Sequence, residues 1–223
     1  LSMANEHKTL LDMTVTPKKC SFGYMLDNGA TTLWEYWDKV GETFNSHLTD
    51  DVGAYDSQNH TMMGGGLVTW MYNGLGGIAA ASAGYRDITF RPGVESGLER
   101  VDCSLETVRG TAVSNWSVLD GAFSWEVTVP VNASAEIVIP AEVAEDLTES
   151  GRDVFEKDGD GLTYIGRNED GDCVYAAGSG TYRFETAAGS SGIPQTGRAV
   201  PIAVAFATLL VAAALILRKK RTA

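Results

Sequence analysis

The sequence predicts an α+β chain of several parts, in which helices come first, an antiparallel β-sandwich follows and a transmembrane helix ends the chain. Residues 1 to about 15 and 61 to 83 are typical of helices. From residue 86 onward, apolar and polar residues alternate with period two, as they do in strands with one buried face. Near the end, residues 199–217 form an uncharged and mostly apolar stretch that is long enough to span a bilayer.

The first 85 residues are predicted to form a helical domain. Pro17 ends the first helix, and residues 18–29 are predicted to be a loop closed by a turn. Thr31 or Thr32 can cap a short helix that runs to about residue 40. A polar loop is expected over residues 41–60, followed by a helix over residues 61–83. That helix is rich in glycine, which costs about 1 kcal/mol per residue relative to alanine, so tight helix packing is expected to compensate.

Residues 86–186 are predicted to form the β-sandwich domain. Gly, Pro and Asp-Gly turns separate its strands every eight to twelve residues or so. The acidic run at residues 158–161 lacks the spaced ligands of a calcium-binding EF-hand and is predicted to be a hairpin turn. The expected strands are residues 86–91, 100–108, 112–118, 122–129 and 133–139.

Charge and cysteine content narrow the functional classes. The formal net charge is −12, which argues against nucleic acid as a partner, because phosphates need cationic groups for neutralisation. The three cysteines, Cys20, Cys103 and Cys173, have no metal-type spacing and are expected to be small core residues. A bridge between Cys103 and Cys173 is the alternative. We expect neither a bound metal nor a cofactor.

Glu35 stands in a dense group of aromatic residues and is the candidate catalytic residue. Trp34, Tyr36 and Trp37 flank it, and Phe22 lies a short distance upstream. Aromatic faces beside an acid suit a carbohydrate site, and an acid in an apolar pocket can be tuned for proton transfer. The alternative is an amphipathic helix whose rings are core residues and whose Glu35 lies in the first turn, where it faces the helix dipole.

Four segments, in the same order, resemble the bacterial α-L-rhamnosidases. Residues 21–35 resemble the motif near the end of that family's catalytic domain, and residues 57–60 resemble its Asn-His segment at the sugar-binding site. Residues 84–92 resemble the passage into the C-terminal β-domain, and residues 178–184 resemble the last strand of that domain. Together, the resemblance extends over roughly residues 15–186.

The resemblance implies a fold and an activity. Residues 1–85 would be the last helices of an (α/α)6 barrel, and residues 86–186 the β-sandwich beside it. The chain would be the C-terminal fragment of an enzyme that hydrolyses terminal α-L-rhamnose from glycosides or polysaccharides by an inverting mechanism. The resemblance makes Glu35 the general base and His60 a residue that hydrogen-bonds a sugar hydroxyl or helps to hold the water, with a buried structural histidine as the alternative. Trp34 is a further substrate-binding candidate, although the residues themselves favour core positions for Trp34 and Trp37, because a helix can present only one of them beside Glu35. The general acid would lie upstream, so this fragment is expected to be inactive alone.

A rival interpretation from another class is a non-catalytic module, anchored to the cell wall, that binds carbohydrate or adheres to surfaces. Such a module would keep the sandwich and use its aromatic residues only for binding. Loss of Glu35 discriminates between the two interpretations, because only the enzyme needs that carboxylate for turnover.

The C-terminal residues resemble a Gram-positive cell-wall sorting signal. Residues 187–197 form a flexible spacer and a sorting motif, and residues 198–223 form the transmembrane helix and a basic tail. The signal implies sortase and peptidoglycan as partners, a precursor held in the membrane, and an extracellular protein anchored to the wall. An ordinary single-pass anchor is the alternative. The motif residues are Ile193, Pro194, Gln195, Thr196 and Gly197, with Ile in place of the usual Leu.

Overall fold

A computed structural model describes residues 4–35, 37, 59–144, 147–153, 158–159 and 161–186. The chain divides into two compact units, which are described separately. The first contains Leu1–Met13 and Gly64–Gly197, and the second contains Thr14–Met63 and Arg198–Ala223.

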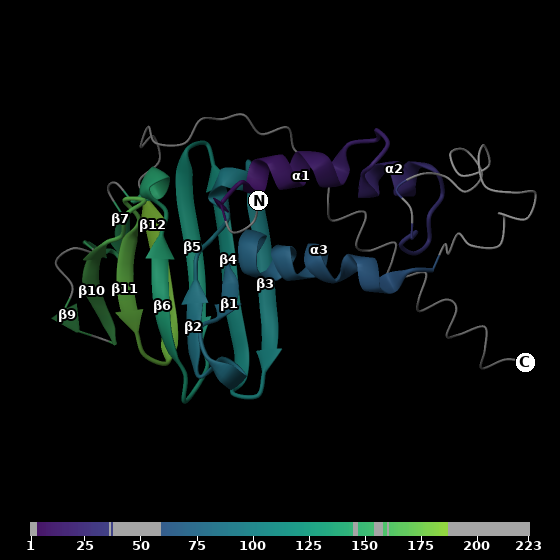
Figure 1. Ribbon diagram of the computed structural model, residues 1–223. Coiled ribbons are helices and arrows are strands. Elements are labelled where there is room, and N and C mark those ends of the chain that lie inside the picture. Colours follow the sequence, from purple (N-terminus) through teal and green to yellow (C-terminus); the bar gives the residue numbers. More distant parts are fainter. Residues whose placement is uncertain are drawn as a thin grey trace, which may run out of the picture. The chain divides into compact units, whose positions relative to one another are not determined.

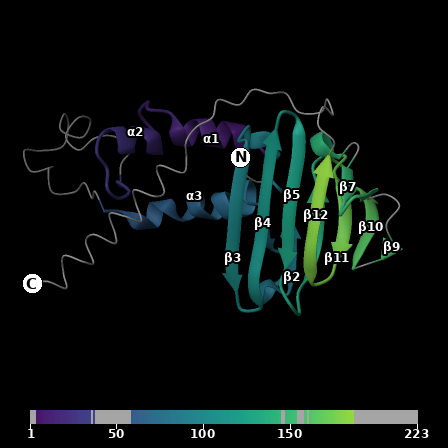
Figure 2. The same ribbon diagram turned by 180° about the vertical axis from the view of Figure 1, so that it is seen from behind.

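Two six-stranded sheets make up most of the first unit and form a β-sandwich. We call the sheet in front in Figure 1 sheet A, with strand order β1-β2-β6-β11-β10-β9. Sheet B faces the viewer in Figure 2 and has the order β3-β4-β5-β12-β7-β8. The strands are β1 (Ile78–Ala80), β2 (Asp87–Phe90), β3 (Arg100–Thr107), β4 (Gly110–Leu119), β5 (Ala122–Val129), β6 (Ser134–Ile139), β7 (Leu147–Glu149), β8 (Arg152–Asp153), β9 (Asp158–Gly159), β10 (Leu162–Arg167), β11 (Cys173–Ala177) and β12 (Gly180–Thr186). Short turns of 3-10 helix lie at η6 (Ala83–Tyr85), η7 (Val94–Ser96) and η8 (Ala141–Val143).

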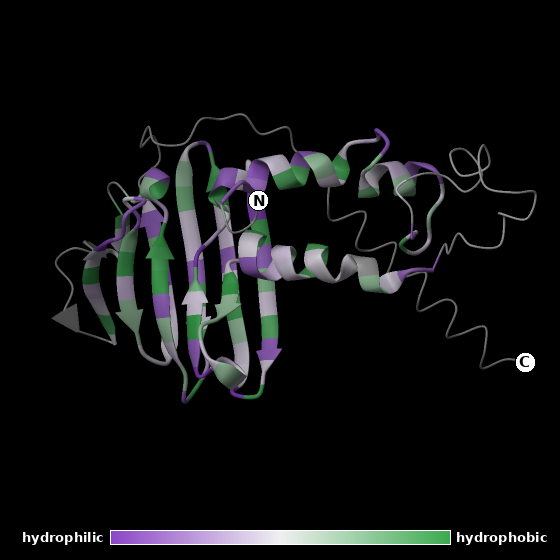
Figure 3. Ribbon diagram, viewed as in Figure 1, coloured by the Kyte–Doolittle hydropathy of each residue, from purple (hydrophilic) through white to green (hydrophobic). Residues whose placement is uncertain are grey.

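The period-two alternation places one face of each sheet in a common core, so the predicted strands are confirmed. The hydropathy colours alternate along the long strands in Figure 3. Rings from both sheets fill the core, and those of Tyr175 on β11 of sheet A and Phe184 on β12 of sheet B lie 6.3 Å apart. The Nε1 of Trp125 donates to Ser114 Oγ at 2.9 Å, which satisfies the polar atom of a side chain that is almost fully buried. Leu162 and Thr163 pair with Gly159 and Asp158, as predicted for a hairpin there.

Sheet A differs from the prediction in two ways. The strands β2 and β6 pair in parallel, with Asp87 opposite Ser134 and Phe90 opposite Ile137, whereas the prediction was wholly antiparallel. The strand β1 lies within residues 61–83, which were predicted to be helical, so the sheet begins before the expected boundary at residue 85.

The predicted helix over residues 61–83 is wrong beyond Leu75. A 3-10 turn, η4 (Thr61–Gly64), leads into α3 (Gly65–Trp70) and a π-helical turn, η5 (Met71–Leu75). The chain then makes a sharp turn at Gly77, where φ is +72° and a Cβ would lie 2.0 Å from the carbonyl oxygen of Arg91. Only glycine fits this backbone and this close approach, so the helix gives way to strand β1.

The helices of the first unit are tied together and to the sandwich by indole hydrogen bonds. The helix α1 (His7–Val15) confirms the predicted first helix over these residues and ends before Pro17, whereas residues 4–6, also predicted to be helical, lie outside it, with φ +55° at Asn5. Trp70 Nε1 on α3 donates to Nδ1 of His7 on α1 at 3.1 Å, and Trp116 Nε1 on β4 donates to the Leu75 carbonyl at 2.8 Å. Burial and the nearby Arg91 guanidinium lower the pKa of His7 to about 4, so the imidazole is neutral at pH 7.

All three cysteines are free thiols, so the alternative of a Cys103–Cys173 bridge is wrong. Cys173 is buried, as expected for a core residue, and Cys103 is half-buried. Cys20 is exposed, which corrects its prediction as a core residue. Burial raises the pKa of the Cys103 thiol to about 11, so it is protonated at pH 7.

None of the helices in the described residues is long and apolar enough to cross a membrane. The predicted membrane span at 199–217, the basic tail and the sorting motif Ile193–Gly197 all lie outside the described residues.

Candidate active site

A short helix, α2 (Phe22–Asp27), precedes Glu35 in the second unit, and its Tyr24 and Met25 pack with Trp34. Ser21 is its N-cap and accepts a hydrogen bond from Tyr24 N at 2.9 Å. At the other end, Asn28 N and Asn28 Nδ2 both donate to the Tyr24 carbonyl, at 3.1 and 2.9 Å. Residues 18–29 were predicted to be only a loop and turn, and α2 corrects that prediction.

Gly23 lets this helix approach the preceding backbone closely. A Cβ at Gly23 would lie 2.4 Å from the carbonyl oxygen of Thr16 and 2.5 Å from that of Val15. Tyr24 and Met25 of α2 are buried against Trp34, with Phe22, Ala30 and Leu33 packed around them. The rings near Glu35 therefore form a small hydrophobic core that fixes the segment leading to it.

Glu35 follows this core on a segment that is not helical. Residues 31–35 form bends and irregular backbone, so the predicted helix capped by Thr31 or Thr32 is wrong over these residues. Thr32 Oγ1 donates to Asn59 Oδ1 at 3.2 Å instead of capping a helix. Hydrogen bonds between residues 32–33 and residues 59–60 replace the local hydrogen bonds of a helix. Glu35 therefore does not lie in the first turn of a helix, and the helix-dipole alternative is not supported.

The structure brings the two predicted site residues Glu35 and His60 together. His60 N donates to the Leu33 carbonyl at 2.7 Å, which places the two segments side by side. Glu35 Oε2 then lies 3.8 Å from His60 Nδ1, and their side chains are 30% and 23% exposed. The separation is longer than a hydrogen bond, yet one oxygen atom about 2.8 Å from each side chain could contact both. The pair can thus hold a single water molecule or hydroxyl group.

The tryptophans on either side of Glu35 have different environments. Trp34 is 6% exposed and belongs to the small core, so little of its ring can stack on a ligand. Trp37 is 45% exposed and makes an edge contact with Phe22, with the ring centres 4.9 Å apart. A substrate-binding role for Trp34 stays a prediction, and its contribution visible in the structure is to support the segment that carries Glu35.

Two further predictions bear on the site. The predicted polar loop at 41–60 lies outside the described residues except for Asn59 and His60. Within the part of the chain that the structure describes, no group of three or more His, Cys, Asp or Glu side chains is placed to hold a metal ion.

Two family models match consecutive parts of the chain. The model for the bacterial alpha-L-rhamnosidase 6 hairpin glycosidase domain matches residues 1–75, which include Glu35 and His60. The model for the bacterial alpha-L-rhamnosidase C-terminal domain matches residues 77–153. The chain is homologous to α-L-rhamnosidases over two adjoining domains. The change between the two models coincides with the sharp turn at Gly77, where helix gives way to strand.

Individual proteins agree with the family models. An α-L-rhamnosidase from Formosa agariphila is 33% identical over 167 residues, covering 74% of this chain and 17% of that protein. The crystal structure of the Streptomyces avermitilis α-L-rhamnosidase complexed with L-rhamnose matches with a TM-score of 0.64 and 29% identity, covering 81% of this chain and 16% of that one. The α-L-rhamnosidase from Dictyoglumus thermophilum matches with a TM-score of 0.63 and 28% identity, covering 80% of this chain and 18% of that one. The chain spans less than a fifth of the length of these relatives.

Sequence reasoning missed the main-chain contacts that build the site. Ser21 followed by Phe22–Asp27 and Asn28-Gly29 carries both end signals of a helix, and these could have indicated α2. The hydrogen bond from His60 N to the Leu33 carbonyl joins segments that are far apart in sequence, and no local pattern predicts it.

Proposed function

We propose that this chain is the C-terminal part of a surface-anchored α-L-rhamnosidase that removes terminal α-L-rhamnose from glycosides or polysaccharides. The observation that carries the proposal is the pairing of Glu35 with His60 at 3.8 Å, inside the segment matched by the six-hairpin glycosidase model. The L-rhamnose bound to the Streptomyces avermitilis relative supports rhamnose as the sugar.

The reaction proceeds with inversion in this proposal. One carboxylic acid protonates the leaving oxygen, and an opposed carboxylate, roughly 6.5–9.5 Å away, activates a water molecule. Glu35 is that base and takes a proton from the water as its oxygen attacks the anomeric carbon. His60 hydrogen-bonds the same water or a sugar hydroxyl, because both side chains can reach one oxygen. The acid comes from the part of the protein upstream of this chain, so the chain alone is inactive.

The test is Glu35→Gln in the full-length protein, assayed on an aryl α-L-rhamnoside. Turnover should fall by at least about 10²–10⁴-fold, the share usually carried by proton transfer, with an unchanged melting temperature. Asp27→Asn is the matched control, since Asp27 is an exposed carboxylate at the end of α2. Near-normal turnover in the Glu35 variant, with sugar binding intact, would favour the non-catalytic binding module instead.

Azide separates the two stereochemical outcomes. Rescue of the Glu35→Gln variant by azide should give a β-configured rhamnosyl azide if the enzyme inverts. An α-configured product would mean that the reaction goes with retention.

Anchoring to the cell wall is the second part of the proposal. It rests on the order of the motif Ile193–Gly197, the apolar span and the basic tail. Sortase would cut after Thr196 and join it to peptidoglycan while the span holds the precursor in the membrane. Fractionation of the source cells tests this, because wall digestion by muramidase should release a protein that ends at Thr196. Extraction by detergent alone, with residues 218–223 still attached, would indicate a plain membrane anchor.

A further inference from the structure

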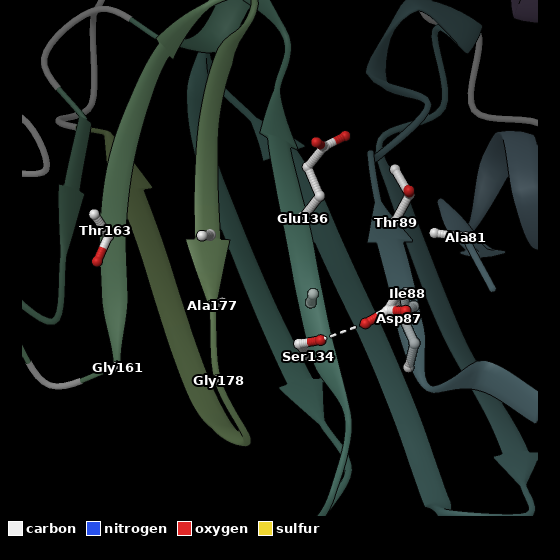
Figure 4. Close-up of a pocket in the computed structure, with 12 residues that line it drawn as sticks. Ala81, Asp87, Ile88, Thr89, Ser134, Glu136, Gly161, Thr163, Ala177 and Gly178 are labelled. Carbon is white, nitrogen blue, oxygen red and sulfur yellow. Dashed lines mark hydrogen bonds between the residues drawn. The ribbon is translucent and has the colours of Figure 1, made fainter.

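The outer face of sheet A has a shallow hollow of about 640 Å³, seen in Figure 4. We propose that this hollow binds a neutral, hydroxyl-rich glycan and so holds a polymeric substrate at a second place on the protein. The identification of the ligand as a glycan rests on the proposed function, whereas the existence of the site does not. The hollow is lined by Ala81, Asp87, Ile88, Thr89, Ser134, Ala135, Glu136, Gly161, Thr163, Ala176, Ala177 and Gly178.

Strand register arranges polar groups in rows across this hollow. Glu136 on β6 lies opposite Thr89 on β2 and Ala176 on β11, and Ala176 lies opposite Thr163 on β10. This row therefore runs hydroxyl, carboxylate, methyl, hydroxyl over four adjacent strands. Neighbouring strands are about 4.8 Å apart, so the row is roughly 14 Å long, the length of a short oligosaccharide.

The floor of the hollow is made of small residues. Ala176 and Gly178 come from β11 and the residue that follows it, and Gly161 directly precedes β10. Small side chains let a flat ring lie close to the sheet, where its hydroxyls can reach the acceptors at the sides. In Figure 4 the labelled polar side chains are Thr163 on β10 and, on the other side of β11, those of β6 and β2: Glu136, Ser134, Thr89 and Asp87.

The second carboxylate of the hollow is already committed to protein partners. Asp87 accepts hydrogen bonds from Ser134 Oγ at 2.6 Å and from Arg86 Nε at 3.1 Å. These bonds, together with one from Ser82, lower the pKa of Asp87 to about 2 and fix its orientation. The negative charge of Asp87 is therefore offset by Arg86. Glu136 is exposed and is the carboxylate left to accept hydrogen bonds from a ligand.

This arrangement selects a neutral glycan over charged ligands. None of the twelve lining residues is basic, and the neighbouring Arg86 is paired with Asp87, so phosphates and uronic acids would meet the Glu136 carboxylate without a cation of its own. A basic peptide is less well matched, because only Glu136 is available to pair with its several cations. Sugar hydroxyls can donate to Glu136 and exchange hydrogen bonds with Thr89 and Thr163. The lining has no aromatic ring, so the affinity should be weak.

The test uses the ¹⁵N-labelled 223-residue chain in detergent micelles, titrated with a linear neutral α-L-rhamnan hexasaccharide. Excess L-rhamnose is present throughout, so that a monosaccharide site near Glu35 is already occupied. Saturable shifts of backbone amides in residues 87–89, 134–136, 161–163 and 176–178 are expected. Glu136→Gln removes the charged acceptor and should weaken binding about three- to tenfold or more, the loss typical of one hydrogen bond. Ala176→Leu fills the floor and should weaken binding because the sugar ring can no longer lie close to the sheet.

Glu185→Gln is the matched control, because Glu185 is exposed on β12 of sheet B. It should leave the titration unchanged, and amide spectra of all variants report whether the fold is kept. No shift at the hollow, or equal affinity in the Glu136 and Ala176 variants, would overturn the proposal. So would shifts with an oligolysine peptide but none with the glycan, since they would identify a cation site.

The result of this titration does not depend on whether the protein turns over its substrate. If Glu35→Gln has normal activity while the hollow binds the glycan, the proposed catalytic function fails and the binding site stands. If the enzyme inverts as proposed but the amides of the hollow do not shift with the glycan, only the inference of a second binding site fails.

Discussion

Acidification should destabilise the first unit through His7, which is 3% exposed and accepts a hydrogen bond from Trp70 Nε1. Its pKa is lowered from 6.5 to about 4 in the folded chain, first by burial and then by the Arg91 guanidinium. Between these two values the unfolded chain binds a proton that the folded chain does not. The free energy of unfolding therefore falls as pH falls, from the unfolded pKa down to the folded one.

The size of the effect follows from the two pKa values. Each pH unit across the window is worth 1.36 kcal/mol, so the loss should be about 2 kcal/mol by pH 5 and on the order of 3 kcal/mol by pH 4. The charged group that acts on His7 is Arg91, whose guanidinium pairs with Glu95 at 2.5 Å and with Asp172 at 3.0 Å. Asp87, with a pKa lowered to about 2, contributes its own loss only at lower pH.

Urea unfolding at several pH values, followed by circular dichroism, measures this dependence. His7→Asn keeps an acceptor for Trp70 but cannot titrate, so its stability should change by about 3 kcal/mol less than that of the wild type between pH 7 and pH 4. Trp70→Phe serves as the comparison, because it removes the donor while leaving His7 able to titrate. Equal pH slopes in the wild type and the Asn variant would refute the assignment of this dependence to His7.

Two further predictions concern residues of the first unit, and the first of them has a matched glycine control. Gly77→Ala should cost several kcal/mol in urea unfolding, because its Cβ would lie 2.0 Å from the Arg91 carbonyl oxygen and its φ is +72°. Gly97→Ala in the same unit, with φ +77° and nothing within 4 Å, should cost only about 1–2 kcal/mol, and equal losses would contradict the clash. Asp172→Ala should cost about 1–3 kcal/mol, because it removes a carboxylate, 3% exposed, from Arg91 Nε while Glu95 still pairs with the guanidinium. A loss well below 1 kcal/mol, like that of a surface pair, would contradict this.

The strands could be predicted from sequence because a period of two, with one buried face, is a local pattern. The parallel pairing of β2 with β6 could not, since it depends on which strands meet in space. The strand β1 was missed for a different reason: its three residues Ile78–Ala80 are too few to show a period, and only two glycines separate them from the helical turn η5. Its place in sheet A comes from pairing with β2, with Ile78 opposite Phe90.

The candidate site shows a similar division. The resemblance singled out Glu35 and His60, and the structure places them together. The aromatic residues around Glu35 led to the wrong prediction of a helix from residue 31. Their spacing suits a helix, but it also suits the irregular segment 31–35, in which Trp34 packs on Tyr24 and Met25 of α2. Gly23 inside α2 weakened the helical signal, although close contact with the Val15 and Thr16 carbonyls explains why glycine stands there.

The main chain sets the spacing of Glu35 and His60, and this makes the proposed shared water testable by a double-mutant cycle. His60 N is bound to the Leu33 carbonyl, so neither Glu35→Gln nor His60→Ala should move the backbone that carries the other residue. If both side chains hold the same oxygen, His60→Ala should lower the turnover of the full-length enzyme roughly three- to tenfold in the wild type and much less in the Glu35→Gln background. Equal effects of His60→Ala in the two backgrounds would mean that the side chains act independently. A lower melting temperature with unchanged kinetics would make His60 a structural residue, and the water would then depend on Glu35 without it.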